Sequence, residues 1–332
     1  MCIFFLSVGQ RDFNALLQEV QVSRSSAFAK GSYSNLRTQV RSYFGFCAYF
    51  HKKPLPADST TIYAFAQFLS RTLKPQTVRN YLSGVKMLHI LHGLPYNFSQ
   101  DPLLQLELRG IARLDPHVPV RAIPITPKIL LVFHNTMDAH SSLHSSVWAC
   151  SLFLFYLMAR LGSILPSSNK TPAQRFLTRD RVNFSLQGLL VTLLHTKTIQ
   201  FGRRRLHIPL VAIQSVLCPV KAYSAALTFT TYSTSGPAFV FLEKGKVKTL
   251  TTSKFIKTFR SILSSAQVAG AKSFTGHSFR RGGASWAFQS GVPGELIQIC
   301  GDWASDSYKR YLEFNMSDKL QLAARLTHNL PC

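Results

Sequence analysis

Acidic residues are scarce in this chain of 332 residues, in which 14 Asp and Glu stand against 38 Lys and Arg. The formal net charge at pH 7 is +24, and the sequence pI is about 10.2. An excess of positive charge this large predicts a polyanionic partner, with nucleic acid ahead of a membrane surface. A generally basic soluble protein, with no particular partner, is the alternative.

Paired cysteines are also lacking. The sequence has no C-x-x-C, and its six cysteines lie far apart: Cys2, Cys47, Cys150, Cys218, Cys300 and Cys332. This spacing argues against a zinc site or a disulfide scaffold, and it fits a reducing compartment. Two histidine pairs have helical spacing: His89 with His92, and His140 with His144. Neither pair has the glutamate of a metalloprotease helix or an evident third ligand, so we expect neither a metal nor a cofactor.

A long hydrophobic run is missing as well. The longest one, from Val147 to Met158, is interrupted by Ser151 and is shorter than the roughly 20 residues that span a bilayer. The N-terminal stretch from Met1 to Leu6 lacks a basic region and is a poor signal peptide. We therefore expect no membrane segment. Because 46% of the residues are hydrophobic, the chain can bury sizeable cores.

Helical periodicity dominates the first part of the chain. After an N-terminal extension over residues 1–26, we expect a helical domain over residues 27–114, with helices beginning near Ser34, Thr60, Lys74 and Pro102. Its basic side chains are candidate contacts with a DNA backbone: Arg37, Arg41, Lys74, Arg79 and Lys86. An ordinary helical bundle with solvated charges is the alternative.

Prolines mark a boundary between two domains. Four of them lie at residues 116, 119, 124 and 127, and sequence this rich in proline forms a semi-rigid, extended linker. We place the linker at residues 115–126 and the second domain at residues 127–332. Thr126 and Pro127 have the residue types of an N-cap and a first helical position, so a helix should begin there.

The second domain is predicted to be mainly α with a small antiparallel β-sheet (α+β). Strands are expected at residues 181–185, 189–195 and 204–210, and an amphipathic helix is expected at residues 253–266. Four basic residues are further candidates for contact with DNA: Arg203, Arg204, Lys254 and Lys257. The alternatives are an exposed sheet edge for the arginines and a solvated helix face for the lysines.

The stretch from Gly276 to Tyr311 contains the strongest chemical pattern. His277 and Arg280 are three residues apart, so they share one face of a helix. Together they suit a phosphate group, and Arg281 follows as another candidate DNA contact. The pair Gly282–Gly283 would allow another backbone to approach closely. A tyrosine hydroxyl in such a cation-rich setting could attack a phosphate as a covalent nucleophile.

This pattern, His-x-x-Arg followed by Gly-x-Trp and then a tyrosine, resembles the C-terminal signature of the tyrosine recombinases, the phage integrase family. The amino-acid sequence of residues 277–284 and 301–311 is most similar to that of the branch carried by eukaryotic transposable elements, such as Cryptons and tyrosine-recombinase retrotransposons. The resemblance implies an N-terminal helical core-binding (SAM-like) domain at residues 27–114, and a catalytic domain at residues 127–332.

The resemblance also implies a set of site residues: Arg160, Lys197, His277, Arg280, Trp303 and Tyr311. Arg160 follows a hydrophobic helix, where the family has its first catalytic arginine, and Lys197 lies at the family's hairpin lysine. Ser163 is a departure, because many members have glutamate there. From the residues alone, Lys197 could equally be a solvated charge and Trp303 a core anchor. Tyr308 is the alternative nucleophile.

The reaction implied by the resemblance is strand cleavage and rejoining through a 3′-phosphotyrosyl link, without a metal or ATP. Its partners would be double-stranded DNA and further copies of the chain, with four protomers on two duplexes. A eukaryotic host would place it in the nucleus, and any other host in the cytoplasm or nucleoid. The alternatives are an inactive, domesticated DNA-binding protein of the same fold and a type IB topoisomerase.

Overall fold

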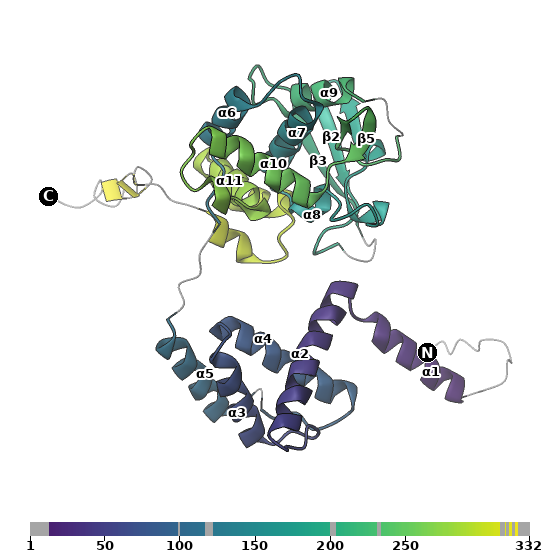
Figure 1. Cartoon of the computed structure of the whole chain (residues 1–332), viewed down its shortest axis with the longest axis vertical. Helices are drawn as coiled ribbons and strands as arrows, with labels where there is room; N and C mark the ends of the chain where they lie inside the picture. Colours follow the sequence, from purple (N-terminus) through teal and green to yellow (C-terminus); the bar gives the residue numbers. More distant parts are fainter. Residues whose placement is uncertain are drawn as a thin grey trace, which may run out of the picture. The chain divides into compact units, whose positions relative to one another are not determined.

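A computed structural model describes residues 13–98, 100–116, 122–199, 204–230 and 234–312, together with residues 316, 319, 320, 323 and 324. The chain divides into two compact units, Met1–Val120 and Arg121–Cys332 (Figure 1). Within the described ranges, no helix is both long enough and apolar enough to cross a membrane.

The first unit consists of helices: α1 (Phe13–Ser26), α2 (Lys30–Tyr49), α3 (Ser59–Ser70), α4 (Pro75–Leu91) and α5 (Pro102–Leu114). The sequence did not predict α1. The predicted start of α2 at Ser34 is wrong, because the N-cap is Ala29, which makes no side-chain cap hydrogen bond and so leaves no signal in the sequence. The start of α5 at Pro102 is confirmed, with the Asp101 carboxylate capping its first turn.

Packing in this unit places α2 against α4, and α3 against both α4 and α5. Aromatic side chains such as Tyr43 and Phe65 are fully buried between these helices. His89 is also buried: its Nε2 accepts from the amide of Ala57 at 2.9 Å, and its Nδ1 donates to the Val85 carbonyl at 2.8 Å. With both ring nitrogens bonded to backbone, His89 is a core histidine.

The second unit has more helices and two small sheets. Its helices are α6 (Pro127–Thr136), α7 (Ser142–Tyr156), α8 (Leu161–Ile164), α9 (Pro219–Thr228), α10 (Thr252–Ser265), α11 (Gly276–Gln289) and α12 (Gly294–Cys300), followed by the 3₁₀ helix η4 (Asp306–Tyr311). All residues from Ser145 to Phe155 of α7 are buried, and α6, α9, α10, α11 and β4 (Val240–Glu243) surround this helix (Figure 1). The N-cap at Thr126 is confirmed, since its hydroxyl accepts from the amide of Ile129 at 3.3 Å.

The predicted antiparallel sheet is confirmed. It contains β1 (Val182–Ser185), β2 (Gly188–Leu193) and β3 (Leu206–Val211) in that order, with Val191 opposite Ile208. A second hairpin, β4 with β5 (Lys246–Thr249), was not predicted. Lys244 and Gly245 form its two-residue turn, with φ values of 51° and 72°. Its strands are only four residues long, and β5 has two lysines among its four residues, so the β pattern is weak.

The end of the predicted linker belongs to the second unit. We call the segment Ala122–Thr126 the strap. Its Ile125 is fully buried and donates its amide to the Ser278 carbonyl of α11 at 2.9 Å. A Cβ on Gly282 would lie 1.8 Å from the Ile125 oxygen, and one on Gly283 would lie 2.0 Å from the Phe155 oxygen of α7. The close backbone approach predicted for the two glycines is thus confirmed.

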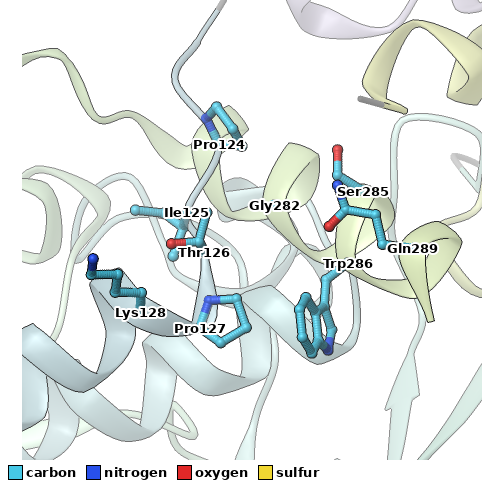
Figure 2. Close-up of a pocket in the computed structure, with 9 residues that line it drawn as sticks. All are labelled: Pro124, Ile125, Thr126, Pro127, Lys128, Gly282, Ser285, Trp286 and Gln289. Atoms are coloured by element: carbon cyan, nitrogen blue, oxygen red, sulfur yellow. The ribbon is translucent and has the colours of Figure 1, made fainter. Parts of the chain in front are cut away.

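A cavity of about 360 Å³ lies where the strap passes α11 and reaches the start of α6 (Figure 2). Its lining comes from both segments: Pro124, Ile125, Thr126, Pro127, Lys128, Gly282, Ser285, Trp286 and Gln289. It is separate from the small cavity lined by Arg160 and Arg280.

Candidate active site

Helix α11 places the predicted His277 and Arg280 at its N-terminal end. Two bonds fix this end: the Ser278 hydroxyl accepts from the amide of Thr275 at 2.9 Å, and the Ser278 amide donates to the Thr275 carbonyl at 3.0 Å. His277 is exposed, whereas Arg280 is 1% exposed. The buried arginine is therefore held by the core, and the histidine stands at its edge.

Arg280 is a buried cation with free donor capacity. Its Nη1 donates to the carbonyl of Met158, and its Cζ lies 3.6 Å from the centroid of the Trp303 ring. Burial and, after it, the charge of Arg160 lower its pKa to about 9, while Tyr311 and Asp302 act in the opposite direction. In the described part of the chain, its Nε and Nη2 are buried and bond to nothing. Two such donors on a cation suit an anionic oxygen.

Arg160 reaches the same place from the end of α7. The chain turns at Met158, whose φ of 47° is left-handed, and Arg160 becomes the N-cap of α8. Arg160 and Arg280 line one small cavity together with Ser163. The helix-terminal arginine predicted to line a site is thus brought beside the predicted second arginine.

Lys197 lies on the loop between β2 and β3 and is exposed. The pKa of His277 is lowered first by partial loss of hydration at the edge of the site and then by the charges of Arg280, Arg160 and Lys197. Three cations from distant parts of the sequence therefore surround one imidazole, and they favour its neutral form at pH 7.

The two tyrosines have different surroundings. Tyr308 is 6% exposed, belongs to a buried cluster with Trp303, and has its hydroxyl 2.6 Å from where a Cβ on Gly294 would be. Tyr311 is partly exposed, and its ring centroid lies 5.9 Å from the Arg280 guanidinium carbon. Only Tyr311 combines nearness to the buried arginine with access to solvent.

Trp303 is both packed and part of the site. It is 6% exposed and stacks on the Arg280 guanidinium, so it is packed in the core beside the candidate site, and its catalytic role stays a prediction. Gly301 makes this possible, since a Cβ there would lie 1.6 Å from Cζ3 of the indole. The spacing Gly-x-Trp therefore has a steric reason.

Asp302 was missed by the sequence analysis, which treated it as the variable residue of Gly-x-Trp. It is 4% exposed, and its carboxylate accepts from the hydroxyls of Thr196 and Thr198 and from Nη2 of Arg204. These partners lie about 100 residues away in the chain, so local pattern offers no signal. Residues 301–311 contain a second acid, Asp306, so the sequence offers no reason to single out Asp302.

The candidate DNA contacts of the first unit lie on two helices that pack together. Arg37 and Arg41 of α2 are exposed, as is Lys74 at the start of α4. Arg79 and Lys86 of α4 are half-buried, and Nζ of Lys86 lies 4.9 Å from the centroid of the Tyr96 ring. These five positions remain predictions.

The candidates of the second unit differ among themselves. Lys257 is exposed on α10, while Nζ of Lys254 lies 3.5 Å from Oε1 of Glu243. Arg204 is paired with Asp302, and Arg203 lies outside the described residues. Arg281 is a correction: it is 7% exposed and donates to the Ala122 carbonyl at 3.1 Å, so it holds the strap instead of facing solvent.

Metal ligands do not gather in the parts of the chain that the structure describes, where no group of three or more His, Cys, Asp or Glu could hold an ion. The chemistry that the site offers is that of cations and a tyrosine. The segments that bring the candidate residues together are the end of α7, the β2–β3 loop, α11, the turn after α12 and η4, which carry Arg160, Lys197, His277, Arg280, Trp303 and Tyr311.

Comparison with known protein families finds a similarity over part of the chain. A sequence profile described as the phage integrase family matches residues 191–317. No curated protein matches the sequence.

Several solved structures have a similar fold. A Tn1549 transposon integrase in complex with transposon right end DNA has a TM-score of 0.60 and 12% identity, covering 93% of this chain and 98% of that one. A lambda integrase dimer bound to a COC′ core site has a TM-score of 0.59 and 12% identity, covering 90% and 94%. The XerH recombinase in a post-cleavage complex with its difH substrate has a TM-score of 0.56 and 14% identity, covering 93% and 83%.

Proposed function

We propose that this chain, which has a phage integrase family domain over residues 191–317, is a tyrosine recombinase that cleaves and rejoins DNA. The observation that carries the proposal is the buried Arg280, which keeps two unpaired donors beside Arg160 and a partly exposed Tyr311. The anionic oxygens of a phosphodiester would accept hydrogen bonds from those two donors. The excess of basic residues, +24 in formal charge, supports DNA as its source.

In the proposed reaction, the Tyr311 oxygen attacks the phosphorus of a DNA phosphodiester, and its proton passes to water or to the neutral His277. The bond from phosphorus to the 5′ oxygen breaks, and that oxygen takes a proton from Lys197. The product is a 3′-phosphotyrosyl diester and a free 5′-hydroxyl, so rejoining can run the same steps backward. Arg160 and Arg280 stabilise the charge of the pentacoordinate transition state, and Trp303 holds Arg280 in place.

The finer parts of the proposal come from the sequence and from the relatives' descriptions. The amino-acid sequence of the C-terminal motif supports the proposal that the chain belongs to an element of the eukaryotic transposon-borne branch and acts in the nucleus. The lambda integrase relative is described as a dimer on a core site. We propose that this chain likewise assembles on DNA, with four protomers joining two duplexes during strand exchange.

The test is adduct formation on suicide substrates. Duplexes drawn from the DNA that flanks the gene carry a nick next to each trial cleavage site. The short fragment that bears the new 5′-hydroxyl then diffuses away, and rejoining is blocked. We expect wild type and Tyr308→Phe to form a covalent adduct on a denaturing gel, and Tyr311→Phe to form none. Loss with Tyr308→Phe alone would overturn the choice of nucleophile. Salt-dependent binding without any adduct would favour an inactive DNA-binding protein, and relaxation of supercoils without site preference would favour a topoisomerase.

A further inference from the structure

We propose that Asp302 is a positioning residue that fixes the loop carrying Lys197 against the cations of the site. The inference rests on the proposed cleavage reaction, in which Lys197 protonates the leaving oxygen. Asp302 is the one acidic side chain that is buried among the described residues. A buried carboxylate in a strongly basic protein has a structural cost, so its partners indicate what it is for.

Among the described residues, the hydrogen-bond partners of this carboxylate come from the segment between β2 and β3 that carries Lys197. Thr196 and Thr198 donate their hydroxyls to Oδ2, and Arg204 donates Nη2 to Oδ1. The two threonines are the neighbours of Lys197 on either side, and Arg204 lies just before β3. The carboxylate therefore accepts hydrogen bonds from residues near both ends of the segment that joins β2 to β3.

The loop continues the network with its own backbone. The Thr196 hydroxyl accepts from the amides of Thr198 at 3.1 Å and Ile199 at 3.0 Å, and the Thr196 amide donates to the Ile199 carbonyl at 3.1 Å. Because the hydroxyl of Thr196 accepts from these amides, its single proton is available to Asp302. Removing the carboxylate would leave a tight turn without its central acceptor.

The backbone of Asp302 is suited to this place. It directly follows Gly301, the C-cap of α12, and has a φ of 54° in the left-handed region. Aspartate and asparagine tolerate that region better than other residues with a side chain. Trp303 comes next and stacks on Arg280. Two adjacent residues thus connect the two parts of the site: Asp302 bonds to the Lys197 loop, and Trp303 stacks on Arg280.

The expected benefit is preorganisation of a flexible acid. A lysine side chain has many rotamers, and a proton donor must lie within hydrogen-bond reach of the leaving oxygen. Fixing the backbone on both sides of Lys197 limits where its ammonium can go. Thr196 of this loop lines the same small cavity as Arg160 and Arg280, which places the loop next to the site.

The test uses the full chain and a substrate whose leaving group needs no proton. In this duplex, sulfur replaces the 5′ bridging oxygen at the cleaved bond. A thiol has a pKa near ~8.5, so it leaves as thiolate, whereas an alcohol leaving group needs an acid. The variants are Asp302→Asn, Lys197→Ala and the control Asp306→Asn, which makes the same change at an exposed carboxylate of the same segment.

On the oxygen substrate, we expect Lys197→Ala to slow adduct formation by roughly 10²- to 10⁴-fold. Asp302→Asn should slow it by about 10²-fold, because the acid is displaced but present. On the sulfur substrate, both variants should approach the wild-type rate. The double variant should be no slower than Lys197→Ala alone, since the two act through one step. Asp306→Asn should match wild type on both substrates.

A merely structural role for Asp302 predicts a different result. Damage to the Trp303–Arg280 stack would slow both substrates equally, and it would add to the Lys197→Ala defect in the double variant. Either result overturns the proposal. The conservative Asp302→Glu variant adds one methylene, and partial recovery on the oxygen substrate would support the role of the carboxylate.

Hydrogen exchange keeps this inference separate from the proposed function. The amides of Thr196, Thr198 and Ile199 should exchange faster in Asp302→Asn than in wild type, while those of α7 stay protected. This measurement needs no DNA. If wild type forms no adduct, the proposed function fails, and unchanged exchange of the loop amides would independently refute the role given to Asp302.

Discussion

Replacing Gly301 with alanine tests the steric logic of the site most directly. The new Cβ would lie 1.6 Å from Cζ3, 2.3 Å from Cε3 and 2.5 Å from Cη2 of the Trp303 indole. Ordinary carbon contacts are about 3.5–4.0 Å, so the ring has to move by more than an ångström. The Arg280 guanidinium carbon lies 3.6 Å from the centroid of that ring. The substitution therefore disturbs the stack as well as the packing.

The expected cost combines two effects. Overpacking a core costs about 1–3 kcal/mol, and a desolvated cation–π contact contributes about 2 kcal/mol. Because the ring can keep part of the contact, we expect the free energy of unfolding of the second unit to fall by about 2–4 kcal/mol. Adduct formation should slow by roughly 10²-fold, because Arg280 loses its orientation.

The assay is urea unfolding followed by circular dichroism, with adduct formation measured on the same preparations. Gly162→Ala is the control, since no atom lies within 4 Å of its added Cβ and Gly162 is in helix α8 of the same unit. It should change stability by less than about 1 kcal/mol. A Gly301→Ala protein that unfolds at the wild-type urea concentration and forms adduct at the wild-type rate would refute this reasoning.

Four further predictions concern charge. Lys197→Gln should raise the pKa of His277, because it removes a cation that lowers it; a histidine NMR titration would show no shift if the loop lies away from α11. Because the pKa of folded His277 is lowered, the unfolded chain binds more protons below pH ~6.5, so His277 should destabilise the fold as pH falls through that window; His277→Gln should flatten this part of a stability–pH profile, and an unchanged profile would contradict it. Sulfate should raise the melting temperature of wild type, by an amount equivalent to about 2.7 kcal/mol at 100 times its Kd, and less so for Arg160→Gln. Arg281→Met should lower stability by about 1–3 kcal/mol through the lost bond to Ala122, and should leave DNA affinity at low salt unchanged.

Much of the fold was predictable because its signals are local. Thr126 with Pro127 begins α6, and Asp101 with Pro102 begins α5, as cap chemistry requires. The start of helix α2 was predicted wrongly because its N-cap, Ala29, has no polar side chain. Where a helix begins without a polar capping residue, only the spacing of its hydrophobic residues indicates the helix, and this spacing does not define its first residue.

The site was predictable as a set of residue types but not as a network. The residues of the C-terminal motif lie within 35 positions of one another, and their order identified them. The partners of Asp302 lie 98 to 106 positions away, and nothing in the chain near Asp302 points to them. Arg281 failed for a related reason: an arginine is expected to face solvent, and only the strap, brought back over α11, gives it a buried acceptor.

The glycine pair of α11 makes this helix dependent on its neighbours. Gly282 and Gly283 each cost a helix about 1 kcal/mol relative to alanine, yet the strap and α7 leave no room for a Cβ at either position. The segment that holds His277 and Arg280 is thus a poor helix by itself and is stabilised from outside. Loosening the strap should release the histidine and the arginine together, so both candidate catalytic groups would be lost as a unit and not one by one.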